Sequence, residues 1–168
     1  NITEKQLPKC NMRLALLDLV FNGGPGLIGK NLRSALANAI KNPKKSAEYR
    51  GAAWTEIRYF SNGDRGSNVQ KGIQNRRNKA ADLFSLSDES STLAELKSTH
   101  KYLQDRYLDI VNRDSTGLGY QKDIEASLAS LVTQISALEA PPRHPRFCPH
   151  RVNKLPKHIQ SSSWRHPH

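Results

Sequence analysis

The sequence predicts an all-α protein, and three features lead to that class. Apolar residues recur at spacings of three and four positions through most of the first 140 residues, as they do along the buried face of a helix. Leucine and alanine, which favour helices, dominate the longest apolar run. Glycine, proline and asparagine separate these stretches and end helices. We expect a helical lobe over residues 1–86, a helical hairpin over 92–139 and a basic, disordered tail over 140–168.

The lobe is organised around the segment Met12–Gly26. Within Leu14–Phe21 every residue except Asp18 is apolar, so the segment predicts a helix that is apolar on nearly all sides. Such a helix is expected at the centre of a fold, with other elements around it. The glycines of Asn22–Gly26 end the helix, and they also leave backbone that a ligand can approach closely.

Further helices are expected along the rest of the lobe. Apolar residues fall on one side of the three longer segments, and Asn42-Pro43 and a glycine-rich turn after Phe60 end two of them. The expected ranges are Asn31–Lys41, Ser46–Arg50, Ala52–Phe60 and Val69–Phe84. Together these helices account for one compact lobe.

A serine-rich, acidic connector, Ser85–Thr92, follows the lobe and supplies an N-cap for the next helix. The segments Leu96–Ile110 and Ile124–Leu138 then carry apolar residues at alternating spacings of four and three. Two such stripes joined by Asp114–Tyr120 predict an antiparallel helical hairpin. The hairpin is expected either to pack on the lobe or to pair with another chain.

The tail concentrates positive charge and contains no acidic residue, so it holds more than half of the net charge of +11. That charge suggests an anionic partner, with nucleic acid and the bacterial cell wall as candidates. Nucleic acid is disfavoured, because the basic residues gather in the tail and few aromatic residues lie among them. His144, Cys148 and His150 fit no zinc-finger spacing, so no metal or cofactor is expected.

No apolar run reaches the roughly 20 residues of a membrane-spanning helix, and no segment has the pattern of an export signal. Cys10 and Cys148 are too few for a disulfide framework and are expected to be free thiols. The sequence therefore predicts a protein without a membrane span and without a signal peptide in this chain.

Two segments of the lobe, FNGGPGLIGKNLRSALANAI and AAWTEIRYFSNGDRGSNVQKGIQNRRNKAADLF, resemble the C-terminal lobe of the phage-type lysozymes. This muramidase family also includes pesticin-like bacterial toxins. In it, a buried helix ends in a phenylalanine-polar-glycine loop, and the last helix of the lobe starts with Asn-Arg-Arg. The matching residues are Phe21, Asn22 and Gly23 in the loop, Trp54, Asn75, Arg76 and Arg77 in the helices, and Phe84 at the end.

The resemblance implies that this chain is the C-terminal part of a peptidoglycan-cleaving glycosidase, from a phage lysin or an antibacterial toxin. It implies one wall of a glycan cleft, at the periplasmic or cell-wall side of a bacterium. Family members carry their catalytic glutamate, aspartate and threonine before the matched region, where this chain has only Asn1–Asn11. No catalytic residue is therefore assigned, and the acid-bearing lobe is expected in a longer parent or a second chain.

Substrate-binding residues are assigned where an amide, backbone groups, an aromatic ring or a guanidinium would meet a sugar in this family. They are Phe21, Asn22, Gly23, Gly24, Tyr59, Asn62, Arg65 and Arg76. For Arg76, a structural hydrogen-bonded pair on the apolar stripe of its helix is the alternative. For the whole chain, the alternative is a module that binds peptidoglycan, or a partner protein through the hairpin, without catalysis.

Overall fold

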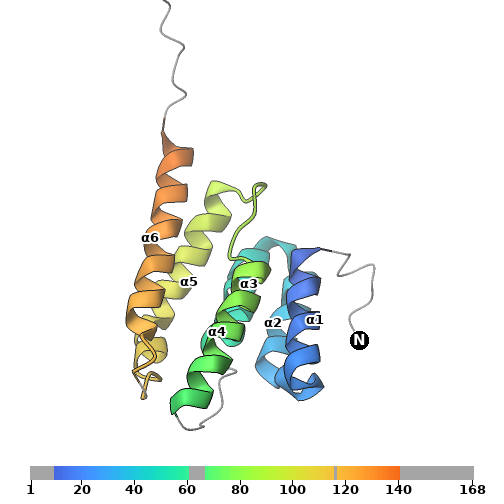
Figure 1. Ribbon diagram of the computed structural model, residues 1–168. Helices are drawn as coiled ribbons and strands as arrows, with labels where there is room; N and C mark the ends of the chain where they lie inside the picture. Colours follow the sequence, from blue (N-terminus) through green and yellow to red (C-terminus); the bar gives the residue numbers. More distant parts are fainter. Residues whose placement is uncertain (1–9, 61–66, 116, 141–168) are drawn as a thin grey trace, which may run out of the picture.

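The computed structural model describes residues 10–60, 67–115 and 117–140, and this part of the chain is built from six α-helices (Figure 1). No strand occurs in it, so the predicted all-α class is confirmed. Short helical turns, labelled η, extend or connect some of the helices. The elements are α1 (Asn11–Gly23), η1 (Pro25–Leu27), α2 (Lys30–Lys41), η2 (Pro43–Lys45), α3 (Ser46–Thr55), η3 (Glu56–Phe60), α4 (Ser67–Phe84), α5 (Leu93–Val111) and α6 (Tyr120–Glu139).

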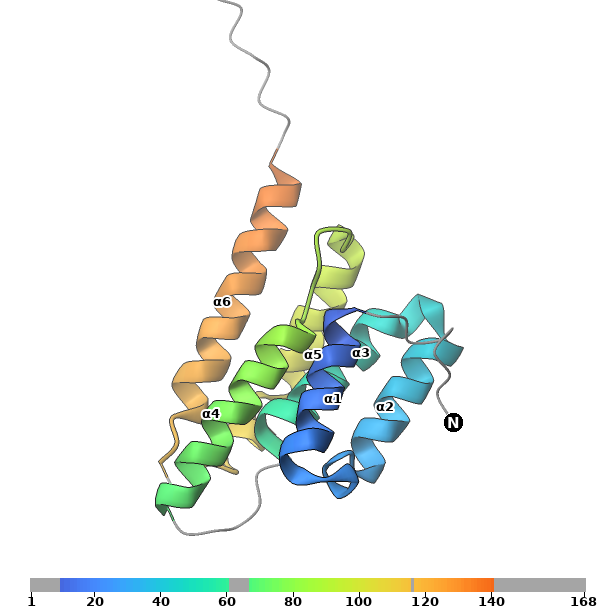
Figure 2. The ribbon, with the colours of Figure 1, turned by 45° about the vertical axis from the view of Figure 1, so that its right-hand side comes forward.

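The hairpin packs on the lobe. In both ribbon views α5 and α6 lie side by side, and α5 also packs against α3 (Figures 1 and 2). Within the lobe, α1 packs on α4 and α2 packs on α3. The C-terminal end of α6 extends beyond the other helices (Figure 2). Of the two expectations for the hairpin, packing on the lobe is the one that the structure shows.

One core runs through the lobe and the hairpin. Its most deeply buried large side chains come from helices of both parts and include Leu32, Ile57, Leu103, Ile124 and Leu131. These residues lie on the stripes that the sequence predicts for their helices. The connector between the two parts therefore joins helices that share a single hydrophobic core.

The expectation that α1 is buried on all sides is wrong. Ala15, Leu16 and Leu19 are buried, whereas Leu14 and Leu17 remain 54% and 55% exposed. The reason is its position: among the described elements, α1 packs mainly against α4 and η1, which cover only one side of it. An apolar helix thus keeps an uncovered face.

The two short helices expected over Ser46–Arg50 and Ala52–Phe60 are one helix, α3, that runs into the π-helical turn η3. Gly51 does not break it. A Cβ atom at position 51 would lie 3.2 Å from Cδ1 of Tyr102, so the glycine lets α5 approach the backbone of α3. The glycine between the two expected helices therefore serves helix packing.

The start of α5 confirms the N-cap expected from the connector. The Thr92 side chain accepts a hydrogen bond from the Glu95 backbone N–H, and the Glu95 carboxylate accepts one from the Thr92 backbone N–H at 2.8 Å. This reciprocal pair satisfies two amide groups that the first turn leaves without helical partners.

Some predictions concern residues outside the described ranges. The loop around Asn62 and Arg65 and the basic tail, with His144, Cys148 and His150, lie there. Within the described ranges, none of the helices has both the length and the apolar character that crossing a membrane requires.

Candidate functional site

Four of the predicted substrate-binding residues, Phe21 to Gly24, lie together at the C-terminal end of α1. The side chain of Phe21 is 90% exposed. The amide nitrogen of Asn22 donates to the backbone oxygen of Asp18 at 2.9 Å and to its carboxylate at 2.8 Å. These bonds hold the amide group and leave its oxygen as an acceptor for a ligand.

The two glycines after Asn22 differ in the room that they leave for a side chain. Gly24 ends α1 with a φ of +79°, a conformation that favours glycine, and its N–H donates to the Val20 carbonyl at 2.8 Å. A Cβ at Gly24 would meet nothing within 4 Å, whereas one at Gly23 would collide with the Leu27 side chain. Gly23 is exposed and Gly24 is half-buried, so the loop ends the helix and also leaves backbone at the surface.

Arg77, and not Arg76, belongs to the buried side of α4. Arg76 is exposed, whereas Arg77 is 6% exposed and its Nη2 lies 3.5 Å from the Cβ position of Gly23. Burial lowers the pKa of Arg77, and its Nε has no hydrogen-bond partner in the described structure. Arg77 therefore supplies a guanidinium beneath the loop.

The sequence contained a pattern from which the burial of Arg77 could have been predicted. Counted from Arg77, the buried residues Ala80, Ala81 and Phe84 fall at spacings of three, four and seven, which define one face of a helix. The sequence interpretation placed Arg76 on that stripe, one position too early. Arg77 thus takes the buried position expected for Arg76, but within the described structure it does not make the hydrogen-bonded pair considered for that residue.

Tyr59 does not lie on an accessible surface. Its side chain is 2% exposed, and its hydroxyl donates to Asp123 Oδ2 at 2.6 Å. With Asn62 and Arg65 outside the described ranges, the predicted residues that the structure brings together are those at the end of α1. We therefore define the α1-end surface as Phe21, Asn22, Gly23 and Gly24, with the buried guanidinium of Arg77 beneath it.

A cluster that the sequence did not predict surrounds Tyr59. Arg58, whose side chain is 9% exposed, donates through Nε and Nη2 to the two carboxylate oxygens of Asp123 at 2.6 and 2.7 Å. Its Nη1 donates to Asp82 at 2.6 Å, and the guanidinium lies 5.0 Å from the Trp54 ring centroid. This cluster fixes η3 and α3 to α4 and α6, which is a structural role.

The protonation of Asp123 couples this cluster to pH. Burial alone would raise the pKa of Asp123, but hydrogen bonds from Arg58 and Tyr59 outweigh it and hold the pKa below its ordinary value of 3.8. The carboxylate therefore stabilises the folded state above about pH 4, and this contribution is lost as the pH falls through the lowered pKa.

We expect the free energy of unfolding of the wild type to fall more steeply between pH 5 and 2.5 than that of Asp123→Asn. The amide variant cannot take up the proton, so the difference in stability between the two proteins should shrink in acid. Urea unfolding of both proteins at several pH values measures this difference in stability. A difference that stays constant down to pH 2.5 would contradict the assignment.

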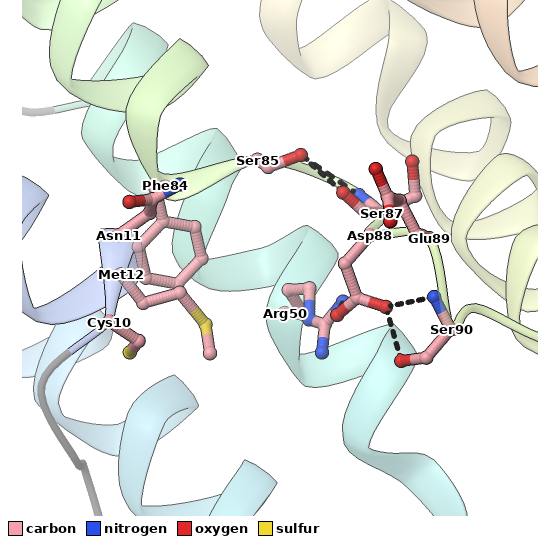
Figure 3. Close-up of a pocket in the computed structure, with 10 residues that line it drawn as sticks. All are labelled: Cys10, Asn11, Met12, Arg50, Phe84, Ser85, Ser87, Asp88, Glu89 and Ser90. Atoms are coloured by element: carbon pink, nitrogen blue, oxygen red, sulfur yellow. Dashed lines mark hydrogen bonds and ion pairs between the residues drawn. The ribbon is translucent and has the colours of Figure 1, made fainter.

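A cavity of about 560 Å³ lies beside the connector between α4 and α5 (Figure 3). Cys10 and Phe84 lie on one side of it, and Arg50 and Asp88 lie on the other. The Asp88 carboxylate is paired with Arg50 at 2.9 Å and accepts bonds from the hydroxyl and backbone N–H of Ser90 at 2.6 and 3.0 Å. Because Asp88 and Arg50 are engaged with each other in holding the connector, we assign this cavity no ligand.

Comparison with known proteins adds no assignment. No protein-family model, no curated protein and no solved structure matches this chain. The resemblance to the phage-type lysozymes therefore stays a prediction from the sequence.

Proposed function

We propose that residues 11–84 form one wall of the glycan cleft of a peptidoglycan-cleaving lysozyme, with the catalytic glutamate supplied from outside this lobe. The site of action would be the bacterial periplasm or cell wall. The observation that carries the proposal is the uncovered face of α1, which ends at the α1-end surface. That face is apolar along the helix and becomes polar at the loop.

The apolar part of this face suits a second lobe. Leu14, Leu17 and Phe21 follow one another at spacings of three and four, so they share one side of α1, and each is more than half exposed. Burying one such side chain is worth about 1.5–3 kcal/mol. A partner lobe on Leu14 and Leu17 would leave Phe21 and the loop at the boundary between the two lobes, where a cleft forms.

The polar part suits a sugar. The Phe21 ring offers an apolar face, the oxygen of the Asn22 amide can accept a hydrogen bond, and Gly23 is an exposed backbone position. Sugar-binding sites combine such groups, because sugars carry both C–H faces and hydroxyl or acetamido groups.

Phe21→Ala and Asn22→Ala are each expected to weaken binding to purified, insoluble peptidoglycan by about fivefold, the loss of roughly one hydrogen bond or ring contact. Both side chains are exposed, so the melting temperature should stay within about 1 °C of the wild type. Co-sedimentation at about 0.3 M salt measures binding while suppressing attraction by the net positive charge.

Leu108→Ala is the matched control, because Leu108 is 68% exposed but lies on α5. Binding by both loop variants that equals the wild type would remove the proposed surface. A turbidity assay on cell walls tests the catalytic part: clearing by this chain alone would contradict an acid supplied from elsewhere. Clearing only after an acid-bearing partner is added would support the lysozyme over a module that only binds.

A further inference from the structure

A groove of about 620 Å³ lies where the hairpin meets the lobe. Its lining residues come from α2, from α3 and η3, and from α5 with the two residues that follow it. The residues of the α1-end surface do not contribute to it. The groove is therefore a separate feature, formed because α5 packs on α3 across Gly51.

Glu56 is an incompletely satisfied charged group in the groove. Its carboxylate is half-buried, and the hydrogen bond that it accepts from Asn31 is long, at 3.3 Å. Burial raises the pKa of Glu56, against the opposing effects of Asn31 and of Arg113. A ligand that brings further O–H or N–H donors would compensate this lost hydration.

Two guanidinium groups are held against aromatic rings in the same groove. Arg113 lies 4.5 Å from the Phe60 ring centroid, and Arg106 lies 6.0 Å from that of Tyr102. Arg106 also pairs with Asp109 at 2.8 Å. These contacts place donor groups at the wall of the groove and restrict their motion.

The charged side chains of the groove favour a ligand that carries no net charge. Two acids, Glu56 and Asp109, alternate with two bases, Arg106 and Arg113, so neither a polyanion nor a polycation is favoured throughout the groove. A hydroxyl group donates to a carboxylate and accepts from a guanidinium, so neutral polyhydroxyl ligands satisfy both.

Amide and aromatic groups complete the groove. Asn38 and Asn112 supply donors and acceptors, and Tyr49 supplies a half-buried ring for the apolar face of a sugar. We infer that this groove binds a neutral oligosaccharide, with Glu56 and Arg113 contacting its hydroxyl or acetamido groups. This inference does not rest on the proposed function, because it uses none of the residues of the α1-end surface.

Titration of the full chain with N,N′,N″-triacetylchitotriose tests the inference, using NMR shifts of backbone amides. The amides that shift should lie in residues 31–38, 49–60 and 102–113. Affinity should be unchanged between about 50 and 500 mM salt, because the ligand is uncharged. Glu56→Ala and Arg113→Ala should each weaken binding by about tenfold, because each removes a charged hydrogen-bond partner. Arg113 is exposed, so its variant is expected to fold.

Glu89→Gln serves as the control, because Glu89 is an exposed acid outside the groove. The inference is overturned if the trisaccharide does not bind, or if both groove variants bind it like the wild type. Displacement of the trisaccharide by glycylglycine or by inorganic phosphate would also overturn it, since the ligand class would then be a zwitterion or an anion. Phe21→Ala should leave the shifts in the groove unchanged, so failure here and failure of the proposed function are distinguishable.

Discussion

Replacing Asp123 with alanine is expected to lower the free energy of unfolding by about 3 kcal/mol, the lower end of the range for breaking a buried ion pair, because the Asp123 side chain is itself 24% exposed. The change leaves Arg58 with two of its charged hydrogen bonds gone and the buried Tyr59 hydroxyl without its acceptor. Asp82 still holds Arg58 Nη1 at 2.6 Å, which is why the upper end of the range is not expected.

Urea unfolding at pH 7, followed by circular dichroism, measures this loss. Asp105→Ala is the matched control, because Asp105 pairs with Lys101 at 3.1 Å on the exposed side of α5. An exposed pair of this kind contributes at most about 0.5 kcal/mol. Equal effects of the two substitutions would mean that the Arg58 cluster does not hold the hairpin on the lobe.

Gly51→Leu is expected to destabilise the protein by about 2 kcal/mol through overpacking. The added side chain would enter the space between α3 and α5, where Tyr102 Cδ1 lies 3.2 Å and Thr99 Cγ2 lies 3.7 Å from the Cβ position. Moving α5 outward to make room would separate part of the shared core.

Gly72→Leu is the control, since Gly72 lies in α4 with nothing within 4 Å of its Cβ position. Both substitutions replace a helical glycine with leucine, so both gain helix propensity, by up to about 1 kcal/mol. The difference between their midpoints in urea therefore isolates the contact with α5. Similar midpoints for the two variants would show that the contact is not tight.

Local sequence patterns predicted most of the helices that the structure contains. The helix predicted over Asn31–Lys41 is observed as Lys30–Lys41, and the two stripes of the hairpin lie within α5 and α6. The loop glycines and Thr92 mark helix ends because their conformations and hydrogen bonds involve residues only a few positions away. Such features depend on neighbours in sequence, which is why a single sequence reveals them.

Features that depend on distant residues were not predictable in this way. Arg58 and Asp123 are 65 positions apart, and nothing near either residue identifies the other. The burial of Tyr59 depends on that pair and on Tyr120, whose ring centroid lies 5.0 Å away. The exposed face of α1 was missed for the opposite reason, since an apolar pattern does not reveal whether anything in the fold covers it.

The ion pairs of Arg58 also bear on which segments of this chain could be transferred to another protein by recombination. The guanidinium belongs to η3, and its two acids belong to α4 and α6, on either side of the connector. A recombination event that transferred only the first 86 residues would carry an almost fully buried cation away from the acid that binds it through two nitrogens. We therefore expect any exchange between proteins that preserves this fold to keep α1 to α6 together.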